Sequence, residues 1–244
     1  MNIVITMAGL GSRFREAGYT VPKFQIEAHG KPLFEWSMIS LSGYYDEENR
    51  YFFIVRKEDD SAGFIHSMCD KLGIGNRKVI EIDALTDGQA TTALLASEYW
   101  DQDRPLLVYN IDTFVKPGAM HKKEIRGDGF IPCFHAPGDH WSFVKLGSGG
   151  QAVEVREKQR ISDNCTLGAY YFKTAALFEK IYESFFSRTA GMEKGEKYIA
   201  PMYNYLIQNG GEVYISVVPE EDVYVLGTPK ELQLFIDNYV PSES

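Results

Sequence analysis

The sequence predicts an α/β protein with a mixed, mostly parallel central sheet. Over the first 112 residues, short runs of β-forming residues alternate four times with segments of helical periodicity. Such alternation is typical of a parallel sheet covered by helices. After residue 130 the predicted strands become shorter and follow one another more closely. A chain of 244 residues can bury about 70% of the surface of its unfolded state, so we expect a globular core, in one large domain or in two small ones.

The first helical turn, at residues 12–17, is stopped by Gly18, and the segment 31–41 follows Gly30. We expect strands where apolar and β-branched residues cluster, at residues 3–6, 51–55, 79–82, 105–111, 130–134, 142–146, 152–156, 165–172 and 213–218. We expect helices where apolar residues recur at helical spacing, at residues 12–17, 31–41, 61–72, 90–100, 175–186, 200–208 and 230–239. No internal repeat, low-complexity tract or long linker interrupts this pattern.

Composition excludes several classes of protein. The net charge of −9 argues against nucleic-acid binding, which needs a basic surface. No run of 18 apolar residues occurs, so we expect no membrane insertion. The five-residue apolar stretch near the N-terminus has no positive charge before it; it is typical of a strand, and we expect a cytoplasmic protein. Cys69, Cys133 and Cys165 lack metal-site spacing, which favours reduced, buried thiols.

The segment MAGLGSRFREAGYTVPK, residues 7–23, contains glycines that fit neither familiar nucleotide-binding motif. A dinucleotide fingerprint needs a small residue three positions after Gly11, where Phe14 stands. A P-loop needs Lys and then Ser or Thr at positions occupied by Phe14 and Arg15. Both motifs are therefore excluded.

The same loop nevertheless suits a phosphate. Gly9 and Gly11 allow backbone amides to approach an anion closely, and Arg13 and Lys23 supply positive charge. Pro22 keeps the preceding residue extended, so Lys23 follows a rigid segment. The alternative is a glycine-rich turn with solvated charges, and spacing alone does not separate the two.

These residues resemble the nucleotidyltransferases that join a nucleoside triphosphate to a phosphomonoester, commonly a sugar 1-phosphate. The family pattern is a strand, Ala-Gly-x-Gly-(Ser/Thr)-Arg and then Pro-Lys. It stands here as Ala8, Gly9, Gly11, Ser12 and Arg13, with Pro-Lys at 22–23. The segment GKPLFEW, residues 30–36, is similar to the subgroup of capsule and surface-polysaccharide biosynthesis.

The resemblance continues along the chain. TDGQATTALL, residues 86–95, resembles the base-reading turn, with Gly88 under the base and Gln89 at its edge. LLVYNIDTFV, residues 106–115, resembles the strand whose aspartate, here Asp112, binds Mg²⁺. EVREKQRISDNCTLGAYYF, residues 154–172, carries the family's Glu-Lys pair, Glu157 and Lys158.

The resemblance implies a single GT-A-like (Rossmann-like) domain over residues 1–244, with a nucleotide-binding half at 1–115 and an acceptor-binding half at 116–244. Arg13 is expected to hold the leaving phosphates and Lys23 to stabilise charge at the α-phosphate. For the acceptor, the resemblance implies Glu157 at a hydroxyl and Lys158 at the phosphate. Further residues inferred for the acceptor wall include Lys145, Tyr198 and Asn204.

The sequence departs from the family near the C-terminus. Relatives commonly carry a second metal-binding aspartate two residues before the glycine of the Gly-Thr segment, where Val225 precedes Gly227 here. A second metal ligand from Asp222, from Glu154 or from the nucleotide alone remains open.

Two other functions compete with nucleotidyl transfer. A glycosyltransferase that consumes a nucleotide sugar shares the architecture, but it usually presents Asp-x-Asp where this chain has Asn110 before Asp112. A nucleotide-binding regulator without catalysis is favoured by the missing carboxylate at position 225. The base stays open among cytosine, uracil and thymine, because Gln89 both donates and accepts. The acceptor, which is a sugar phosphate, a phosphocholine-like molecule or a phospho-amide, and the oligomeric state also stay open.

Overall fold

The computed structural model describes residues 1–187 and 195–241. Two parts of the predicted acceptor half, 188–194 and 242–244, lie outside the described residues. The first half forms a parallel sheet in which β1 (Asn2–Thr6) lies between β4 (Arg50–Arg56) and β6 (Leu106–Asn110). The outer strand β5 (Arg77–Ile82) runs parallel to β4.

The second half extends this sheet with mostly antiparallel strands. They are β8 (Gly129–His135), β9 (Ser142–Leu146), β10 (Ala152–Glu157), β11 (Asn164–Thr166), β12 (Ala169–Phe172) and β13 (Val213–Val217). Within the described residues, ten strands form one sheet in the order β10-β9-β11-β8-β12-β6-β1-β4-β5, with β13 parallel to β8. Within the sheet, β12 joins the second half to the first, because it pairs antiparallel with β6. The predicted mixed α/β sheet is confirmed.

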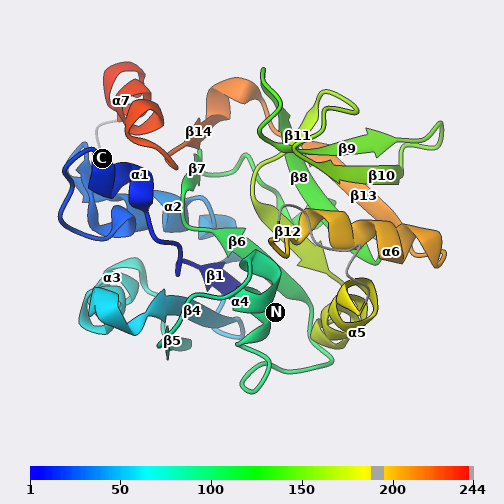
Figure 1. The fold of residues 1–244 in the computed structure, drawn as a ribbon, viewed down its shortest axis with the longest axis horizontal. Helices are drawn as coiled ribbons and strands as arrows, with labels where there is room; N and C mark the ends of the chain where they lie inside the picture. Colours follow the sequence, from blue (N-terminus) through cyan, green and yellow to red (C-terminus); the bar gives the residue numbers. More distant parts are fainter. Residues whose placement is uncertain (188–194, 242–244) are drawn as a thin grey trace.

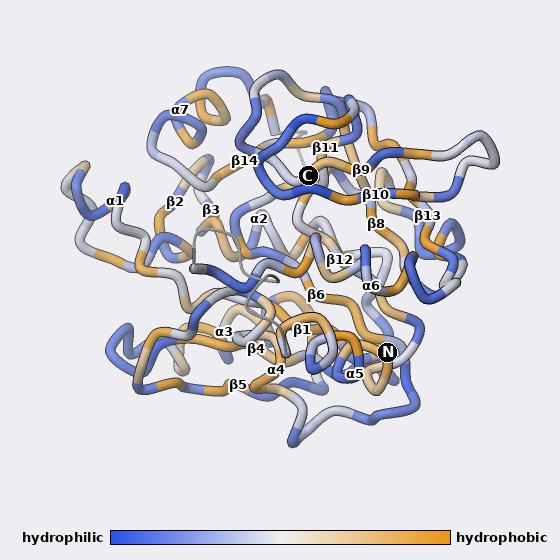
Figure 2. Tube along the Cα trace, turned by 45° about the vertical axis from the view of Figure 1, so that its right-hand side comes forward, coloured by the Kyte–Doolittle hydropathy of each residue, from blue (hydrophilic) through white to orange (hydrophobic). Residues whose placement is uncertain are grey.

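Helices cover both faces of the sheet (Figure 1). On one face, α2 (Leu33–Ile39) and α3 (Ala62–Leu72) pack over Ile3 and Ile5. On the other, Val4 belongs to the core that contains α4 (Gln89–Leu94), α5 (Ala175–Phe186) and α6 (Tyr203–Gln208). Ile3 and Ile5 face one side of the sheet and Val4 faces the other, because successive side chains of a strand point to opposite faces. Figure 2 shows hydrophobic residues along β1, β4 and β6 and hydrophilic ones on outer loops.

A third core joins the C-terminal segment to the first half. The strands β7 (Thr113–Val115) and β14 (Val223–Val225) pair antiparallel, and α7 (Pro229–Asn238) packs beside them. In Figure 1, α7 lies near α1 (Ser12–Glu16) and α2. The rings of Trp36, Phe114 and Phe235 form the aromatic centre of this third core. The pairing carries the Gly-Thr segment back to the carboxyl end of β6.

Several predicted elements need correction. The helix predicted at 90–100 ends as an α-helix at Leu94 and continues as turns. The strand predicted at 165–172 is two strands, β11 and β12, because Gly168 has a φ of +86° and interrupts the extended backbone. The predicted helix at 31–41 begins at Leu33, since Lys31–Pro32 form β3 and pair with β2 (Glu27–Ala28). The short pair β7 and β14 was not expected.

Among the described residues, none of the helices has the length and apolar character needed to cross a membrane. The three cysteines are free and buried, as predicted from their spacing. Burial raises the pKa of the Cys69 thiol to about 12 and that of Cys133 well above its ordinary value.

Candidate active site

A pocket opens at the carboxyl ends of the central parallel strands. Thr6 ends β1 and lies in register with Asn110, which ends β6. Loops that leave neighbouring parallel strands at this edge are the usual ligand sites of α/β sheets. Its walls come from both halves of the chain and include Ala8, Gly9, Arg13, Lys23, Gly88, Gln89, Asp112, Trp141, Ser142, Glu157, Tyr170, Tyr198, Val225, Gly227 and Glu231.

The loop after β1 supplies Ala8, Gly9 and Arg13 to the pocket. A Cβ atom added to Gly9 would meet no atom within 4 Å, so this glycine leaves open space at the pocket wall. Gly11 has a φ of +60°, a conformation that favours glycine, and it precedes α1. The predicted nucleotide residues Gly11 and Ser12 support the loop but do not line the pocket.

Lys23 and Asp112 form an ion pair in the pocket. Lys23 Nζ donates a 2.7 Å hydrogen bond to Asp112 Oδ2, and both side chains are largely buried. The exposed Arg13 guanidinium, also at the pocket wall, has no ion-pair partner among residues 1–187 and 195–241. Arg13, Lys23 and Asp112, the three residues predicted to act on the triphosphate and its metal, therefore all line this pocket.

The turn at Gly88 and Gln89 lies beside them. Gly88 has a φ of +141°, and a Cβ there would lie 2.5 Å from the backbone nitrogen of Lys197. Only glycine fits such an approach. The Gln89 carboxamide donates hydrogen bonds to Thr6 Oγ1, at 3.3 Å, and to Asn110 Oδ1. The ends of β1 and β6 therefore hold the residue predicted to read the base.

A segment of the second half docks on this turn. The backbone amide of Lys197 donates to the Asp87 carbonyl at 2.7 Å, and the Lys197 carbonyl accepts from Ala90 at 3.0 Å. Lys197 Nζ also lies 2.7 Å from Asp87 Oδ2. The sequence did not predict this contact, because it joins a residue of the base-reading motif to one that lies far away in the chain and in no motif given above.

On the opposite side of the pocket, Glu157 is 7% exposed and accepts a hydrogen bond from Ser142 Oγ. Lys158 Nζ lies 3.5 Å from Glu157 Oε1 and donates to the Tyr198 hydroxyl at 2.6 Å. Burial opposes the charge on Lys158, but the Tyr198 hydrogen bond and Glu157 outweigh it and raise the Lys158 pKa above its ordinary value. The predicted residues Glu157, Lys158 and Tyr198 are thus brought together.

Three residues predicted for the acceptor, Lys145, Lys158 and Asn204, are not among the residues that line the pocket, although Lys158 contacts Glu157 and Tyr198, which do. Lys145 is exposed on β9, one position out of phase with Ser142 and Val144; alternate residues of a strand face opposite sides, so Lys145 points away from the face that carries Ser142. The carboxamide of Asn204 accepts from Val155 N at 2.9 Å and donates to Val155 O at 2.7 Å. Asn204 thus satisfies the backbone of edge strand β10.

The position of the usual second aspartate is occupied by Val225, which lines the pocket. Next to it, a Cβ at Gly227 would lie 3.4 Å from Asp112 Oδ2 and 3.5 Å from Glu231 Oε2. The carboxylates of Asp112 and Glu231 therefore both lie close to the Cβ position of Gly227. Glu231 lies at the start of α7, where its backbone amide donates a hydrogen bond to the Thr228 side chain. Thr228 and Glu231 thus form a Thr-x-x-Glu capping pattern. In the sequence, Glu231 is therefore typical of a helix start, and it was not predicted as a site residue.

The two candidates for a second metal ligand that the sequence left open lie elsewhere. Asp222 pairs with Lys116 at 2.8 Å, and Glu154 pairs with Arg156 at 2.7 Å. Neither lines the pocket. Among the described residues, no group of three or more His, Cys, Asp or Glu side chains gathers to hold a metal. Mg²⁺ does not require one, since it is usually bound by one or two carboxylates together with substrate phosphates.

A glycine loop with two cations, a strand-end aspartate and the carboxylate of the Glu-Lys pair line this pocket, which is the set of residues that the resemblance to nucleotidyltransferases implies. The comparisons agree. A nucleoside-diphosphate-sugar pyrophosphorylase from Vibrio cholerae RC9 is 36% identical, with a TM-score of 0.90 over 97% of this chain and 100% of that chain. The chain belongs to the sugar-phosphate nucleotidyltransferase family and is an enzyme of the nucleotidyltransferase class.

More distant structures share the fold. An inositol-1-phosphate CTP transferase from T. maritima is 17% identical, with a TM-score of 0.75, 99% of this chain and 98% of that chain being covered. A CTP:phosphocholine cytidylyltransferase from Streptococcus pneumoniae is 18% identical, with a TM-score of 0.72 and 97% of each chain covered. No protein-family model matches the sequence, and no curated protein matches it.

Proposed function

We propose that the enzyme joins CTP, UTP or dTTP to a phosphomonoester, a sugar 1-phosphate, and releases pyrophosphate, in the cytoplasmic synthesis of surface-polysaccharide precursors. The observation that carries the proposal is one pocket that brings two groups of predicted residues together. Arg13, Lys23 and Asp112 line it together with Glu157 and Tyr198, and Lys158 pairs with these last two residues without lining the pocket itself. A triphosphate and a phosphate acceptor fit these two groups, and membership of the family supports transfer between them.

In the reaction, an acceptor phosphate oxygen forms a bond to the α-phosphorus as the bond to the β-phosphate breaks, and the electron pair leaves with pyrophosphate. Lys158 orients the acceptor phosphate, and Lys23 stabilises charge at the α-phosphate. Arg13 binds the departing phosphates. Both reactants are anions, so positioning and charge neutralisation supply most of the catalysis. The acceptor phosphate is already ionised near neutral pH, and a general base is not needed.

Asp112 and Glu231 are proposed to hold Mg²⁺ with the triphosphate. Their oxygens lie within 3.5 Å of the Cβ position of Gly227, and carboxylates are hard ligands of the kind this ion prefers. The ion, when bound, neutralises the triphosphate oxygens. Glu231 would then replace the aspartate that relatives carry at position 225.

For the base, Gln89 Nε2 donates to Thr6 and Asn110, and Gln89 Oε1 can accept from the amino group of cytosine or from N3–H of uracil or thymine. For the acceptor, the carboxylate of Glu157 and the hydroxyl of Ser142 offer hydrogen-bond partners to sugar hydroxyls. A phosphocholine-like acceptor is the second candidate, favoured by the Trp141 and Tyr198 rings at the same pocket.

A panel assay tests the proposal. The purified protein with Mg²⁺ receives each ribonucleoside triphosphate or dTTP together with sugar 1-phosphates or phosphocholine, and pyrophosphate release is recorded with product mass. We expect release that requires one acceptor and one pyrimidine nucleotide. Release without an acceptor, or none with any pair, would contradict the proposal.

A further inference from the structure

The loop of residues 136–141, which joins β8 to β9, carries aromatic side chains to the acceptor side of the pocket. His140 and Trp141 line the pocket together with Phe134. The rings of His140 and Trp141 lie 4.2 Å apart, and the Trp141 ring meets Phe134 edge-on at 5.2 Å. The position of this loop therefore sets one wall of the acceptor space.

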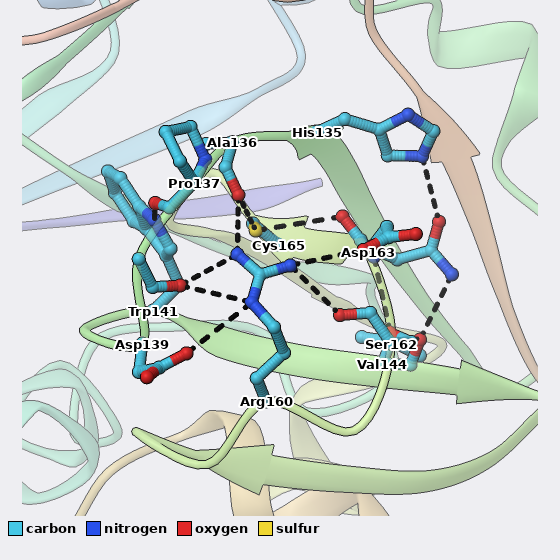
Figure 3. Close-up of polar contacts among 12 residues, drawn as sticks. His135, Ala136, Pro137, Asp139, Trp141, Val144, Arg160, Ser162, Asp163 and Cys165 are labelled. Atoms are coloured by element: carbon cyan, nitrogen blue, oxygen red, sulfur yellow. Dashed lines mark hydrogen bonds and ion pairs between the residues drawn. The ribbon is translucent and has the colours of Figure 1, made fainter.

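Arg160 holds the loop from below (Figure 3). Its Nη2 donates to the carbonyls of Ala136, at 2.6 Å, and Gly138, at 2.7 Å, and its Nε lies 3.4 Å from Asp139 Oδ1. On its other side, Nη1 donates to Asp163 Oδ1 at 3.2 Å. The guanidinium thus joins the loop to the segment before β11.

The loop held by Arg160 also contacts the Trp141 ring through a hydrogen bond. Trp141 Nε1 donates to the Pro137 carbonyl at 3.0 Å, which lies between the two carbonyls bound by Arg160. The Trp141 carbonyl in turn accepts from the backbone of Lys158 at 2.8 Å. The indole is therefore held by the Pro137 carbonyl and the Trp141 backbone by Lys158, so the orientation of the ring depends on the loop that Arg160 holds.

An arginine suits this task for a geometric reason. Its planar group presents five donors in a fixed fork and can bind carbonyls and a carboxylate at once. A lysine at the same position offers a single charged centre, which cannot reach both sides of the loop in the same geometry. The guanidinium also lies 4.8 Å from the centre of the Phe143 ring, which further limits its movement.

We propose that Arg160 is a positioning residue for the acceptor: it fixes the Trp141 ring as the wall against which the acceptor's sugar ring packs. This inference rests on the proposed function. Arg160 follows Lys158 by two positions, so one turn delivers both the acceptor-binding pair and the residue that holds the facing wall. Arg160 itself does not line the pocket.

The test compares Arg160→Gln with wild-type enzyme, using the nucleotide and sugar phosphate that support turnover. We expect the KM for the acceptor to rise about tenfold or more, with the KM for the nucleotide and kcat changed less than about twofold, since the nucleotide end is untouched. Arg160→Lys should recover part of the acceptor KM. Arg156→Gln, a matched change of an exposed arginine paired with Glu154 on β10, should change neither KM.

A double-mutant cycle separates positioning from general loosening of the fold. In a Trp141→Ala background, Arg160→Gln should raise the acceptor KM little further, because both changes remove the same wall. Independent, multiplying effects would overturn the proposal, as would an unchanged acceptor KM or equal increases for nucleotide and acceptor. Wild-type turnover in the same assay tests the proposed function. An absence of wild-type turnover would therefore contradict the proposed function, whereas the variants test the role of Arg160.

A second variant covers the case in which Arg160→Gln does not fold. Gly138 has a φ of +88°, and a Cβ there would lie 2.9 Å from His140 Nδ1. Gly138→Ala therefore strains the loop at a carbonyl that Arg160 binds while keeping the Arg160 side chain itself, and we expect the same selective rise in acceptor KM. An unchanged acceptor KM in this variant would count against the proposal.

Discussion

Lys23 Nζ donates a 2.7 Å hydrogen bond to Asp112 Oδ2, and this ion pair joins two residues that are 89 positions apart in the chain. It brings the end of the glycine loop to the carboxylate after β6. The arrangement places a cation and a candidate metal ligand at one point of the pocket, where the α-phosphate is proposed to react.

Asp112→Asn should abolish turnover and retain nucleotide binding. The amide is a weaker metal ligand and leaves Lys23 without its charged partner, so we expect kcat to fall by about 100-fold or more. Pyrophosphate release and calorimetric nucleotide titration measure the two properties. Asp70→Asn, which removes a surface aspartate paired with Arg77, is the control; equal turnover in both variants would contradict the role of Asp112.

Glu231→Gln should weaken metal binding in the presence of nucleotide by about tenfold, because one of the two proposed carboxylates loses its charge. Manganese titration followed by electron paramagnetic resonance measures this without turnover. The backbone hydrogen bond to Thr228 does not use the changed atoms, so α7 should stay capped.

Restoring a carboxylate at the usual position provides the complementary test. Val225→Asp in the Glu231→Gln background should recover metal affinity, since position 225 also lines the pocket. Glu47→Gln, at an exposed position, serves as the control. Unchanged manganese affinity in Glu231→Gln would rule out Glu231 as a ligand.

Gly88→Ala should destabilise the protein by about 1–3 kcal/mol and raise the KM for the nucleotide. The φ of +141° and the 2.5 Å approach to Lys197 leave no room for a Cβ. Urea denaturation measures the loss. Gly63→Ala in α3, where a Cβ meets no atom within 4 Å, should instead be neutral or stabilising; similar losses in both variants would show that position 88 is not special.

The pair of Asp87 and Lys197 should stay charged across neutral pH. Burial opposes ionisation of Asp87, but hydrogen bonds from Lys197 and Thr91 outweigh it and lower its pKa below 3.8. The stabilisation is therefore present above pH 3.8 and is lost as pH falls through the lower folded pKa. The Asp87 hydrogen bond raises the pKa of Lys197, so its contribution is present below pH 10.5 and is lost at higher pH, as its raised pKa is passed.

Hydrogen exchange of the Ala90 amide, which donates to the Lys197 carbonyl, reports on this contact. Protection should be constant from about pH 5 to pH 9 after correction for intrinsic exchange, and Asp87→Asn should reduce it at pH 7. Equal protection in the variant would mean that the backbone hydrogen bonds alone hold the segment.

The cysteines should resist modification in the folded protein. Their burial raises the pKa of Cys69 to about 12 and raises the pKa values of Cys133 and Cys165, which leaves little reactive thiolate. Ellman's reagent at pH 8 should label them only after unfolding in urea. Rapid labelling of the native protein would contradict this.

The sequence predicted the parallel half of the sheet because strands such as β1 and β4 are continuous apolar runs. It missed β7 and β14, which are three residues each and are defined by a pairing distant in sequence. That pairing brings Glu231 toward Asp112. Local sequence patterns therefore could not predict that Glu231 supplies the proposed second carboxylate. Lys145 and Asn204 show the converse: side-chain type suggested a ligand, but strand phase and an edge-strand hydrogen bond decided otherwise.

Isotope transfer tests the central claim, nucleotidyl transfer to a phosphate acceptor, most directly. The acceptor carries ¹⁸O in its phosphate oxygens, and the products of its reaction with the pyrimidine nucleotide are analysed by mass. We expect all label to stay in the nucleotide-linked acceptor and pyrophosphate to be unlabelled, because an acceptor oxygen attacks the α-phosphorus. Label in pyrophosphate, or free nucleoside monophosphate in place of the conjugate, would contradict it.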